Sequence, residues 1–183
     1  MSDDRKLDPV LVRPVKPNPY DLLPARPRLE VRSTDVADGQ PLDDAQVAAG
    51  GNTSPQLSWS GAPEGTGSYV VTCFDPDAPT PSGFWHWAVV DLPADCTSLP
   101  AGAGAEGATL PGKAFMLRND AGSASFMGAA PPPNDQPHRY YFAVHSVADD
   151  SLGIDANASN AVLYFNLAFK ATARGYIHGT YEH

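Results

Sequence analysis

Three polar side chains, Asp75, His86 and His138, each lie beside an apolar run of the sequence. Asp75 follows the run YVVTCF and precedes Pro76, which lacks a backbone N–H and therefore stops a strand. His86 lies near the start of the run WHWAVVDL, and His138 lies just before the run YYFAVHSV. If the three runs are neighbouring strands, the carboxylate and the two imidazoles converge.

The trio predicts a pocket for a small anion. A nearby carboxylate favours the protonated form of a histidine, and imidazolium N–H groups donate to phosphate or carboxylate oxygens. Since a lone carboxylate repels a phosphate, either a histidine must be charged or the anion must keep a proton that Asp75 accepts. Taken singly, each residue also has an ordinary structural interpretation, because Asp before Pro is common in turns.

Two other interpretations of Asp75, His86 and His138 remain open. A two-histidine, one-carboxylate set can bind a metal, but the register of the histidines is unknown from the sequence. We rank a metal site below an anion site and expect no cofactor. Asp75 with His86 or His138 is also the best acid/base pair for a weak hydrolase. Because no G-x-S-x-G nucleophile elbow is present, we expect a binding protein, not an enzyme.

The elements around these residues are expected to be mainly strands. Apolar runs and turn signals predict strands at 29–33, 40–42, 69–74, 85–92, 140–147 and 176–181. Alternation along the strands places His138 on one face with Tyr140, Phe142 and Val144, and places His86 with Ala88, Val90 and Leu92. A well-buried helix is predicted over 160–174, capped by Ser159 and ended by Gly175.

Length and composition favour one mostly-β domain. The chain has 183 residues, with 19 Pro and 16 Gly, which indicates short strands and many loops. Residues 1–19 are polar and proline-rich, so we interpret them as an N-terminal tail draped over a domain of residues 20–183. We interpret His145 as structural, because it faces away from His138, and Asp77 with Arg139 as a structural ion pair.

The charge of the chain excludes some partners. A net charge of −9, with 12 Lys and Arg in no cluster, argues against nucleic acid and against an anionic membrane surface. The start MSDDRKLDPV has no signal-like apolar stretch, and no run could span a bilayer, so we expect a cytoplasmic protein. The sequence leaves open whether Cys73 and Cys96 are bonded and whether the chain forms a homodimer.

At these motifs the chain resembles the phosphatidylethanolamine-binding proteins, also called Raf kinase inhibitor-like proteins, in their bacterial branch. The resemblance runs from about Leu29 to the C-terminus and rests on five segments in the family's order: SPQLSWSG at 54–61, DPDAP at 75–79, WHW at 85–87, GAAPPP at 128–133 and HRY at 138–140. It implies a large antiparallel sheet packed on a smaller one, with few helices.

The resemblance also implies a site and a range of functions. The pocket residues would be Asp75, His86 and His138, lined by Tyr140 and the Ala130-Pro131 region, with a cis peptide before Pro131. The family often has Gly-Pro where this chain has Ala130-Pro131. The implied function is binding of a small anion or phospholipid headgroup by a regulatory module. The alternatives are a protein-interaction inhibitor of a serine protease or kinase, and the weak hydrolase.

Overall fold

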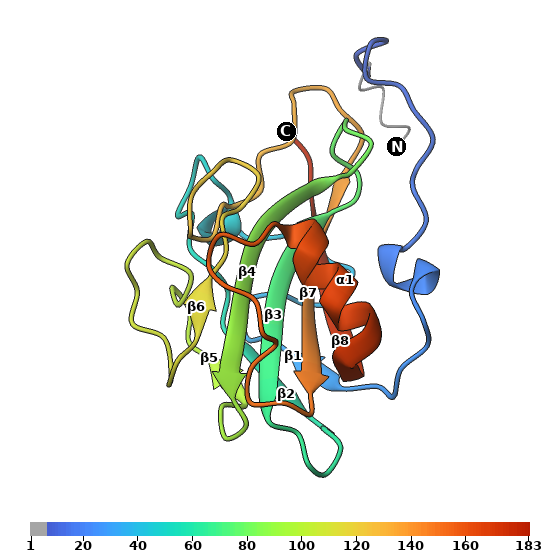
Figure 1. Cartoon of the computed structure of the whole chain (residues 1–183). Coiled ribbons are helices and arrows are strands. Elements are labelled where there is room, and N and C mark those ends of the chain that lie inside the picture. Colours follow the sequence, from blue (N-terminus) through green and yellow to red (C-terminus); the bar gives the residue numbers. More distant parts are fainter. Residues whose placement is uncertain (1–6) are drawn as a thin grey trace.

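The computed structural model describes residues 7–183 as two antiparallel sheets with few helices (Figure 1). The larger sheet has the order β6 (Phe115–Met116), β4 (Phe84–Pro93), β3 (Ser68–Asp75), β7 (His138–Val147) and β8 (Ala171–Tyr181). The smaller sheet has the order β1 (Glu30–Arg32), β2 (Leu57–Ser60) and β5 (Ser98–Leu99). The helices are α1 (Asn160–Lys170) and the short 3-10 turns Pro19–Leu22 and Asp44–Gln46.

The mostly-β fold is confirmed, and so is the adjacency of the three strands that carry the polar trio. The central strand β3 pairs with β4 on one side and β7 on the other. The end of β3 at Asp75 lies opposite the start of β4 at Phe84, and Phe74 pairs with Tyr141 of β7. The pairing therefore brings the polar residues to one end of the large sheet.

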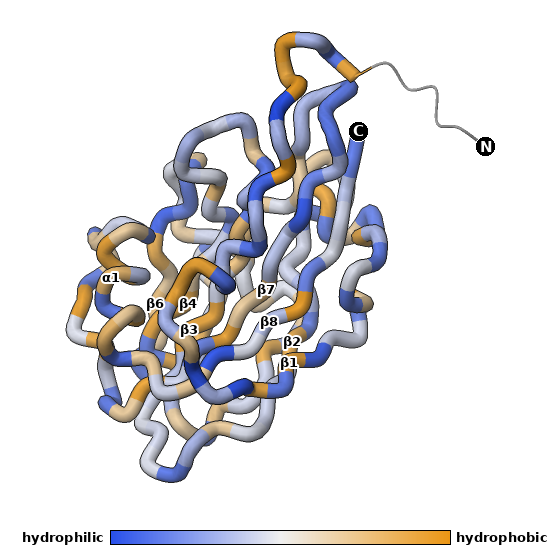
Figure 2. Tube along the Cα trace, turned by 90° about the vertical axis from the view of Figure 1, so that its right-hand side faces the viewer, coloured by the Kyte–Doolittle hydropathy of each residue, from blue (hydrophilic) through white to orange (hydrophobic). Residues whose placement is uncertain are grey.

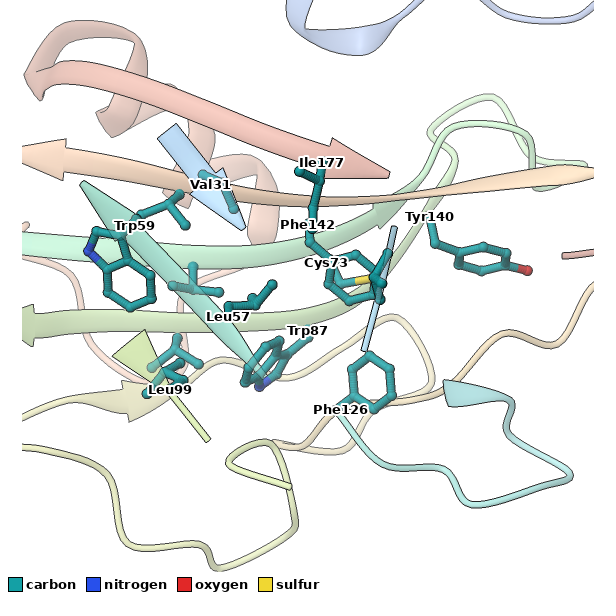
Figure 3. Packing of buried hydrophobic residues seen from close by; sticks show 14 of the residues in the cluster. Val31, Leu57, Trp59, Cys73, Trp87, Leu99, Phe126, Tyr140, Phe142 and Ile177 are labelled. Atoms are coloured by element: carbon teal, nitrogen blue, oxygen red, sulfur yellow. The ribbon is translucent and has the colours of Figure 1, made fainter. Parts of the chain in front are cut away.

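The main core lies between the two sheets (Figure 3). Trp87, Cys73 and Phe142 of the large sheet pack in one cluster with Leu57 and Trp59 of the small sheet. Each fully buried large apolar side chain contributes about 1.5–3 kcal/mol, so this layer holds the sheets together. Figure 3 shows Tyr140 at the edge of the cluster, with its hydroxyl pointing away from the packed apolar side chains.

The other face of the large sheet is covered by α1 (Figure 1). Leu163 and Leu167 of the helix pack on Val70, Ala88 and Val90, and Figure 2 shows the apolar residues gathered around β3, β4 and α1. The Ser159 hydroxyl accepts a hydrogen bond from the Val162 N–H at 3.2 Å, as the predicted cap requires. The prediction of a well-buried helix is wrong for its outer face, where Phe165 is 68% exposed and Phe169 is 73% exposed.

The predicted end of the helix is also wrong. The helix ends at Lys170, and residues 171–174 begin β8, so Gly175 lies within a strand. Arg174 pairs with His145 of β7, and the Ser146 and Thr172 hydroxyls lie 2.8 Å apart. Pairing with β7 overrides the local helical pattern at these residues.

The outer edge of β8 is covered by two segments from the first quarter of the chain. Leu29 N–H donates to the Arg174 carbonyl at 3.0 Å, and Leu42 N–H donates to the Thr180 carbonyl at 2.8 Å. Residues 40–42 thus form an isolated bridge at Pro41, not the strand that was predicted. The two cysteines are unbonded. No helix among residues 7–183 is long and apolar enough to cross a membrane.

The N-terminal segment, residues 7–28, runs along the side of the large sheet (Figure 1). It begins at the end of the sheet that carries the C-terminus and continues to the opposite end, as both overall views show (Figures 1 and 2). The Asn18 amide donates to the Tyr176 hydroxyl at 2.8 Å, and the rings of Tyr20 and Tyr176 stack at 4.8 Å. The part of the predicted tail that the structure describes therefore contacts the body. Residues 1–6 of that tail lie outside the described residues.

We expect Gly175→Ala to destabilise the fold by about 3 kcal/mol, because β8 and residue 29 approach too closely for a side chain. A Cβ atom on Gly175 would lie 2.1 Å from the Leu29 carbonyl oxygen. Urea unfolding measures the loss. The control is Gly65→Ala, where φ is +82° but no atom lies near, and which should cost only about 1 kcal/mol. Equal losses for the two variants would contradict the packing argument.

Candidate functional site

A cavity of about 240 Å³ opens where β3 ends and where β4 and β7 begin. Its polar lining comes from Asp75, His86, His138 and Tyr140. The rest of its wall is mostly apolar and consists of Ala78, Pro79, Thr80, Phe84, Met127, Ala130 and Pro132. The fold therefore brings together five of the six predicted site residues. The sixth, Pro131, is buried but does not line the cavity. The next residue, Pro132, lines it instead.

His86 reaches the cavity through a β-bulge. Cys73 pairs with Trp87 and Phe74 pairs with Trp85, so His86 is the extra residue of β4. The predicted alternation is wrong at this point, since Ala88 and Val90 face α1 while the His86 ring lies 5.1 Å from that of Tyr140. Bulges commonly redirect a side chain beside a functional site. This one directs His86 into the cavity.

His138 is held between two carboxylates. Its Nδ1 lies 2.7 Å from Asp75 Oδ2, and its Nε2 lies 2.8 Å from Asp135 Oδ2. Burial lowers the pKa of His138, but the hydrogen bonds and charges of Asp75 and Asp135 outweigh it and raise the pKa above the ordinary value. We therefore treat His138 as an imidazolium that donates both of its N–H groups to carboxylates.

Arg13 completes this charge arrangement from the N-terminal segment. Its guanidinium contacts both oxygens of Asp135, at 2.7 and 2.9 Å, and also donates to the Asp77 and Leu11 carbonyls. Burial raises the pKa of Asp135, but hydrogen bonds from Arg13 and His138 lower it below its usual value. Asp75, His138, Asp135 and Arg13 thus form a row of alternating charge with no net charge.

The turn after β3 is fixed by further contacts. Asp75 Oδ1 accepts from the backbone N–H groups of Asp77 at 2.7 Å and Ala78 at 3.1 Å. The Asp77 carboxylate accepts from Arg139 Nε at 2.7 Å, which confirms the predicted ion pair. Lys16 donates to the Thr80 carbonyl at 2.6 Å. Both oxygens of Asp75 are thus already bonded within the protein.

His86 differs from His138 in its charge. Its Nδ1 lies 2.8 Å from the Met127 carbonyl, which can only accept, so Nδ1 carries the proton. Burial lowers the pKa of His86 below its ordinary value, against the opposing effect of the Met127 hydrogen bond and the Asp75 charge. The imidazole is therefore neutral at pH 7. Its Nε2, which has no hydrogen-bond partner among the described residues, is an acceptor.

The Tyr140 hydroxyl is a second polar group without a partner. The residue is only 1% exposed, yet its oxygen makes no hydrogen bond within the described part of the chain. Burial, and then the charge of Asp75, raise the pKa of Tyr140, so the hydroxyl keeps its proton. A buried hydroxyl left unpaired costs about 1–3 kcal/mol, which a bound ligand could recover.

The proline loop differs from expectation in one respect. All peptide bonds of the described residues are trans, so the predicted cis peptide before Pro131 is wrong. The trans form of an X–Pro bond is favoured by about 0.5–1 kcal/mol unless the surrounding structure selects the other form. The loop is held instead by the contact of Asp135 with His138 and by two backbone hydrogen bonds of Ala129. The Ala129 N–H donates to the Gln46 carbonyl, and the Ala129 carbonyl accepts from the Ala48 N–H, both at 2.9 Å.

The geometry limits the chemistry that the site can perform. No group of three or more His, Cys, Asp and Glu side chains in residues 7–183 is arranged to hold a metal ion. As an imidazolium, His138 offers no lone pair to a metal and no base to a water molecule. His86 Nε2 and the Tyr140 O–H are the groups that remain able to bond a ligand, one as acceptor and one as donor.

Two residues of the site, Arg13 and Asp135, are missing from the sequence-based prediction. Asp135 lies three residues before His138, a carboxylate–histidine spacing that could have drawn attention to it. Arg13 has no such signal, because the segment around it is polar and rich in proline. Its contact with Asp135 joins residues separated by 122 positions.

The fold and the pocket agree with comparisons to known proteins. The sequence matches the profile of the phosphatidylethanolamine-binding proteins over residues 32–182, and the chain belongs to this family. It is 45% identical to UPF0098 protein YbcL of Escherichia coli K12 over 159 residues, which is 84% of this chain and 87% of that protein. Identity to UPF0098 protein YbhB of the same organism is 43% over 150 residues, covering 79% and 94% of the two chains.

Solved structures show the same architecture. The crystal structure of E. coli YbcL, described as a member of the mammalian PEBP family, matches with a TM-score of 0.82 at 44% identity, covering 85% of this chain and 99% of that chain. The homologue CT736 of Chlamydia trachomatis matches with a TM-score of 0.73 at 26% identity, covering 85% and 98%.

We expect the pair formed by Asp135 and His138 to make stability depend on pH. The raised pKa of His138 adds stability that is complete below its ordinary value of 6.5 and is lost as pH rises through the raised value. The lowered pKa of Asp135 adds stability above its ordinary value of 3.8 that is lost as pH falls through the lowered value. Asp135→Asn should therefore cost about 3 kcal/mol near pH 5.5 and less at pH 9, measured by unfolding at both pH values.

The matched control is Asp38→Asn. Asp38 pairs with His178 at 3.1 Å, but the Asp38 side chain is 62% exposed, so its loss should cost less than 1 kcal/mol. If Asp135→Asn lost the same stability at pH 5.5 and pH 9, His138 would not be the charged partner.

Proposed function

We propose that the chain binds a small phosphate monoanion, free or as the headgroup of a phosphorylated molecule, in the cavity between His86 and Tyr140. The observation that carries this proposal is the buried Tyr140 hydroxyl, which has no hydrogen-bond partner among the described residues and lines the cavity. A phosphate oxygen accepts its proton and removes the cost of leaving it unpaired.

The charge state of the ligand follows from the rest of the site. The row of charges from Asp75 to Arg13 is neutral, and His86 is uncharged. Lys16, whose ammonium group donates to the Thr80 carbonyl in the cavity wall, adds one positive charge, which matches a monoanion and not a dianion. A monoanion such as ROPO₃H⁻ carries one P–OH group, which donates to His86 Nε2, while its other oxygens accept from Tyr140. This arrangement satisfies both unpaired groups at once. The mostly apolar wall leaves room for a short organic substituent.

We expect binding to strengthen as the pH falls. The complex holds one more proton than the dianion and neutral His86 do separately. Affinity should therefore rise about tenfold for each pH unit below 8 and level off near pH 6, the second pKa of a phosphomonoester. Calorimetric titration with O-phosphoethanolamine at pH 8, 7 and 6 measures this slope. An affinity that rises with pH would contradict the proposal.

We expect Tyr140→Phe and His86→Leu each to weaken binding about tenfold at pH 6, because each removes one of the two ligand bonds. The control is Tyr69→Phe, which alters a buried tyrosine at the other end of β3 that does not line the cavity. Thermal unfolding checks that the variants remain folded. Unchanged affinity in both site variants would show that the ligand binds elsewhere.

A further inference from the structure

A second cavity, larger than the first, lies at the opposite end of β7 and β8. Its volume is about 320 Å³, and its lining includes Arg26, Arg28 and Arg174. His138 pairs with Tyr181 at one end of this strand pair, and His145 pairs with Arg174 near the other. Seven residues of strand separate the two histidines, so the two cavities lie roughly 20 Å apart.

The charge of this cavity is unusual for the chain. The protein has a net charge of −9 with 12 Lys and Arg, yet three arginines and only one acidic residue, Asp21, line this cavity. In the part of the chain that the structure describes, no ion pair joins any of the three arginines to an acidic side chain. Like charges repel, so such a group of arginines is stabilised by an anion.

The three arginines are held in different ways. Arg26 donates to the Ala168 carbonyl at 2.8 Å, and Arg174 lies over the Tyr20 ring and donates to the Tyr20 and Pro24 carbonyls, both at 3.3 Å. These bonds fix two guanidiniums in place while leaving some of their N–H groups free. The Arg28 guanidinium makes no hydrogen bond to another described residue. It is therefore the group that is most free to bind a ligand.

An unpartnered buried histidine lies behind the arginines. His145 is 1% exposed, and neither of its ring nitrogens has a hydrogen-bond partner among the described residues. It borders a small void of about 10 Å³, which shares Leu23, Arg26 and Arg174 with the larger cavity. Such a void holds one water molecule at most. Burial, and then the charge of Arg174, lower the pKa of His145 to about 3, so it is a neutral polar group.

We propose that this second cavity, formed by Arg26, Arg28 and Arg174, is a binding site for an organic phosphomonoester in its dianionic form. The three arginines and Asp21 sum to a charge of +2, which matches the −2 charge of the ligand. Guanidinium groups bind phosphate oxygens in pairs of parallel hydrogen bonds. The stacked rings of Tyr20 and Tyr176 form an aromatic wall for the organic part of the ligand.

The two sites are distinguished by opposite dependence on pH. The first cavity selects the monoanion and weakens above pH 6, whereas the arginine site selects the dianion and strengthens as pH rises through the same value. The arginine site therefore does not rest on the function proposed for the first cavity. At pH 8 a phosphomonoester should occupy mainly the arginine site.

The test is a titration of the full chain with phenyl phosphate at pH 8, followed by NMR of the backbone amides. We expect saturable shifts at Leu23, Gly175 and Tyr176, which line the arginine site, and much smaller ones at Met127 and Ala130. The ring nitrogens of His145 should also shift. Shifts confined to Met127 and Ala130, or no saturable shifts up to 20 mM ligand, would overturn the proposal.

Variants separate binding at the site from general charge effects. Arg28→Gln should weaken binding about tenfold, since it removes a charged hydrogen-bonding group that supports no other part of the fold. The matched control is Arg32→Gln. Arg32 is exposed, and its guanidinium lies 3.1 Å from the carboxylate of Glu30, two positions earlier in the same strand. This variant should leave the affinity unchanged. If the two variants weakened binding equally, the effect would come from the overall charge of the protein and not from direct contact with Arg28, and the proposal would be overturned.

Discussion

The charged His138 between Asp75 and Asp135 is the interaction on which this end of the molecule depends. Asp75 also bonds the turn after β3, and Asp135 lies in the loop that follows the proline run, so one imidazolium joins two loops that are far apart in sequence. Arg13 then binds Asp135 and the Asp77 carbonyl, which ties the N-terminal segment to the same point. A buried charge is tolerated only when it is paired and hydrogen-bonded. Removing one member therefore leaves its neighbours buried and uncompensated, and the walls of the cavity lose their shared support.

A consequence of this pairing is that the most conspicuous polar residues of the pocket are not the ones free to bind a ligand. Asp75 and His138 have their hydrogen-bonding groups occupied by the protein, and their charges cancel within the row that ends at Arg13. The polar groups of the lining that remain able to bond a ligand are the neutral His86, which offers an acceptor, and Tyr140, which offers a donor. With one acceptor and one donor available, the positions of the donor and acceptor groups on a ligand matter as much as its net charge.

The sequence carried enough information to predict the fold and much of the lining of the cavity. Period-two alternation placed His138 with Tyr140 correctly, because β7 is regular throughout that stretch. It failed at His86, since a bulge shifts the alternation and no residue type at that position marks it. It failed again at residues 171–174, where pairing with β7 overrides the helical pattern, and at Arg13, whose role depends on a contact across 122 residues. The local sequence pattern therefore predicts side-chain direction where a strand or helix is regular. It does not predict geometry that depends on a contact with a residue far away in the sequence.

The N-terminal segment connects these observations, because it contributes to both cavities. Arg13 and Lys16 bond the walls of the first cavity, and Tyr20, Arg26 and Arg28 line the second. All five residues precede residue 32, where the match to the phosphatidylethanolamine-binding family begins. The family match thus covers the large sheet, the trio of Asp75, His86 and His138, and also Asp135 and Arg174, whereas Arg13, Lys16, Arg26 and Arg28 precede it. The two proposed ligand preferences therefore depend on the shared fold together with this segment, which supplies Arg13 and Lys16 beside one cavity and Arg26 and Arg28 in the other.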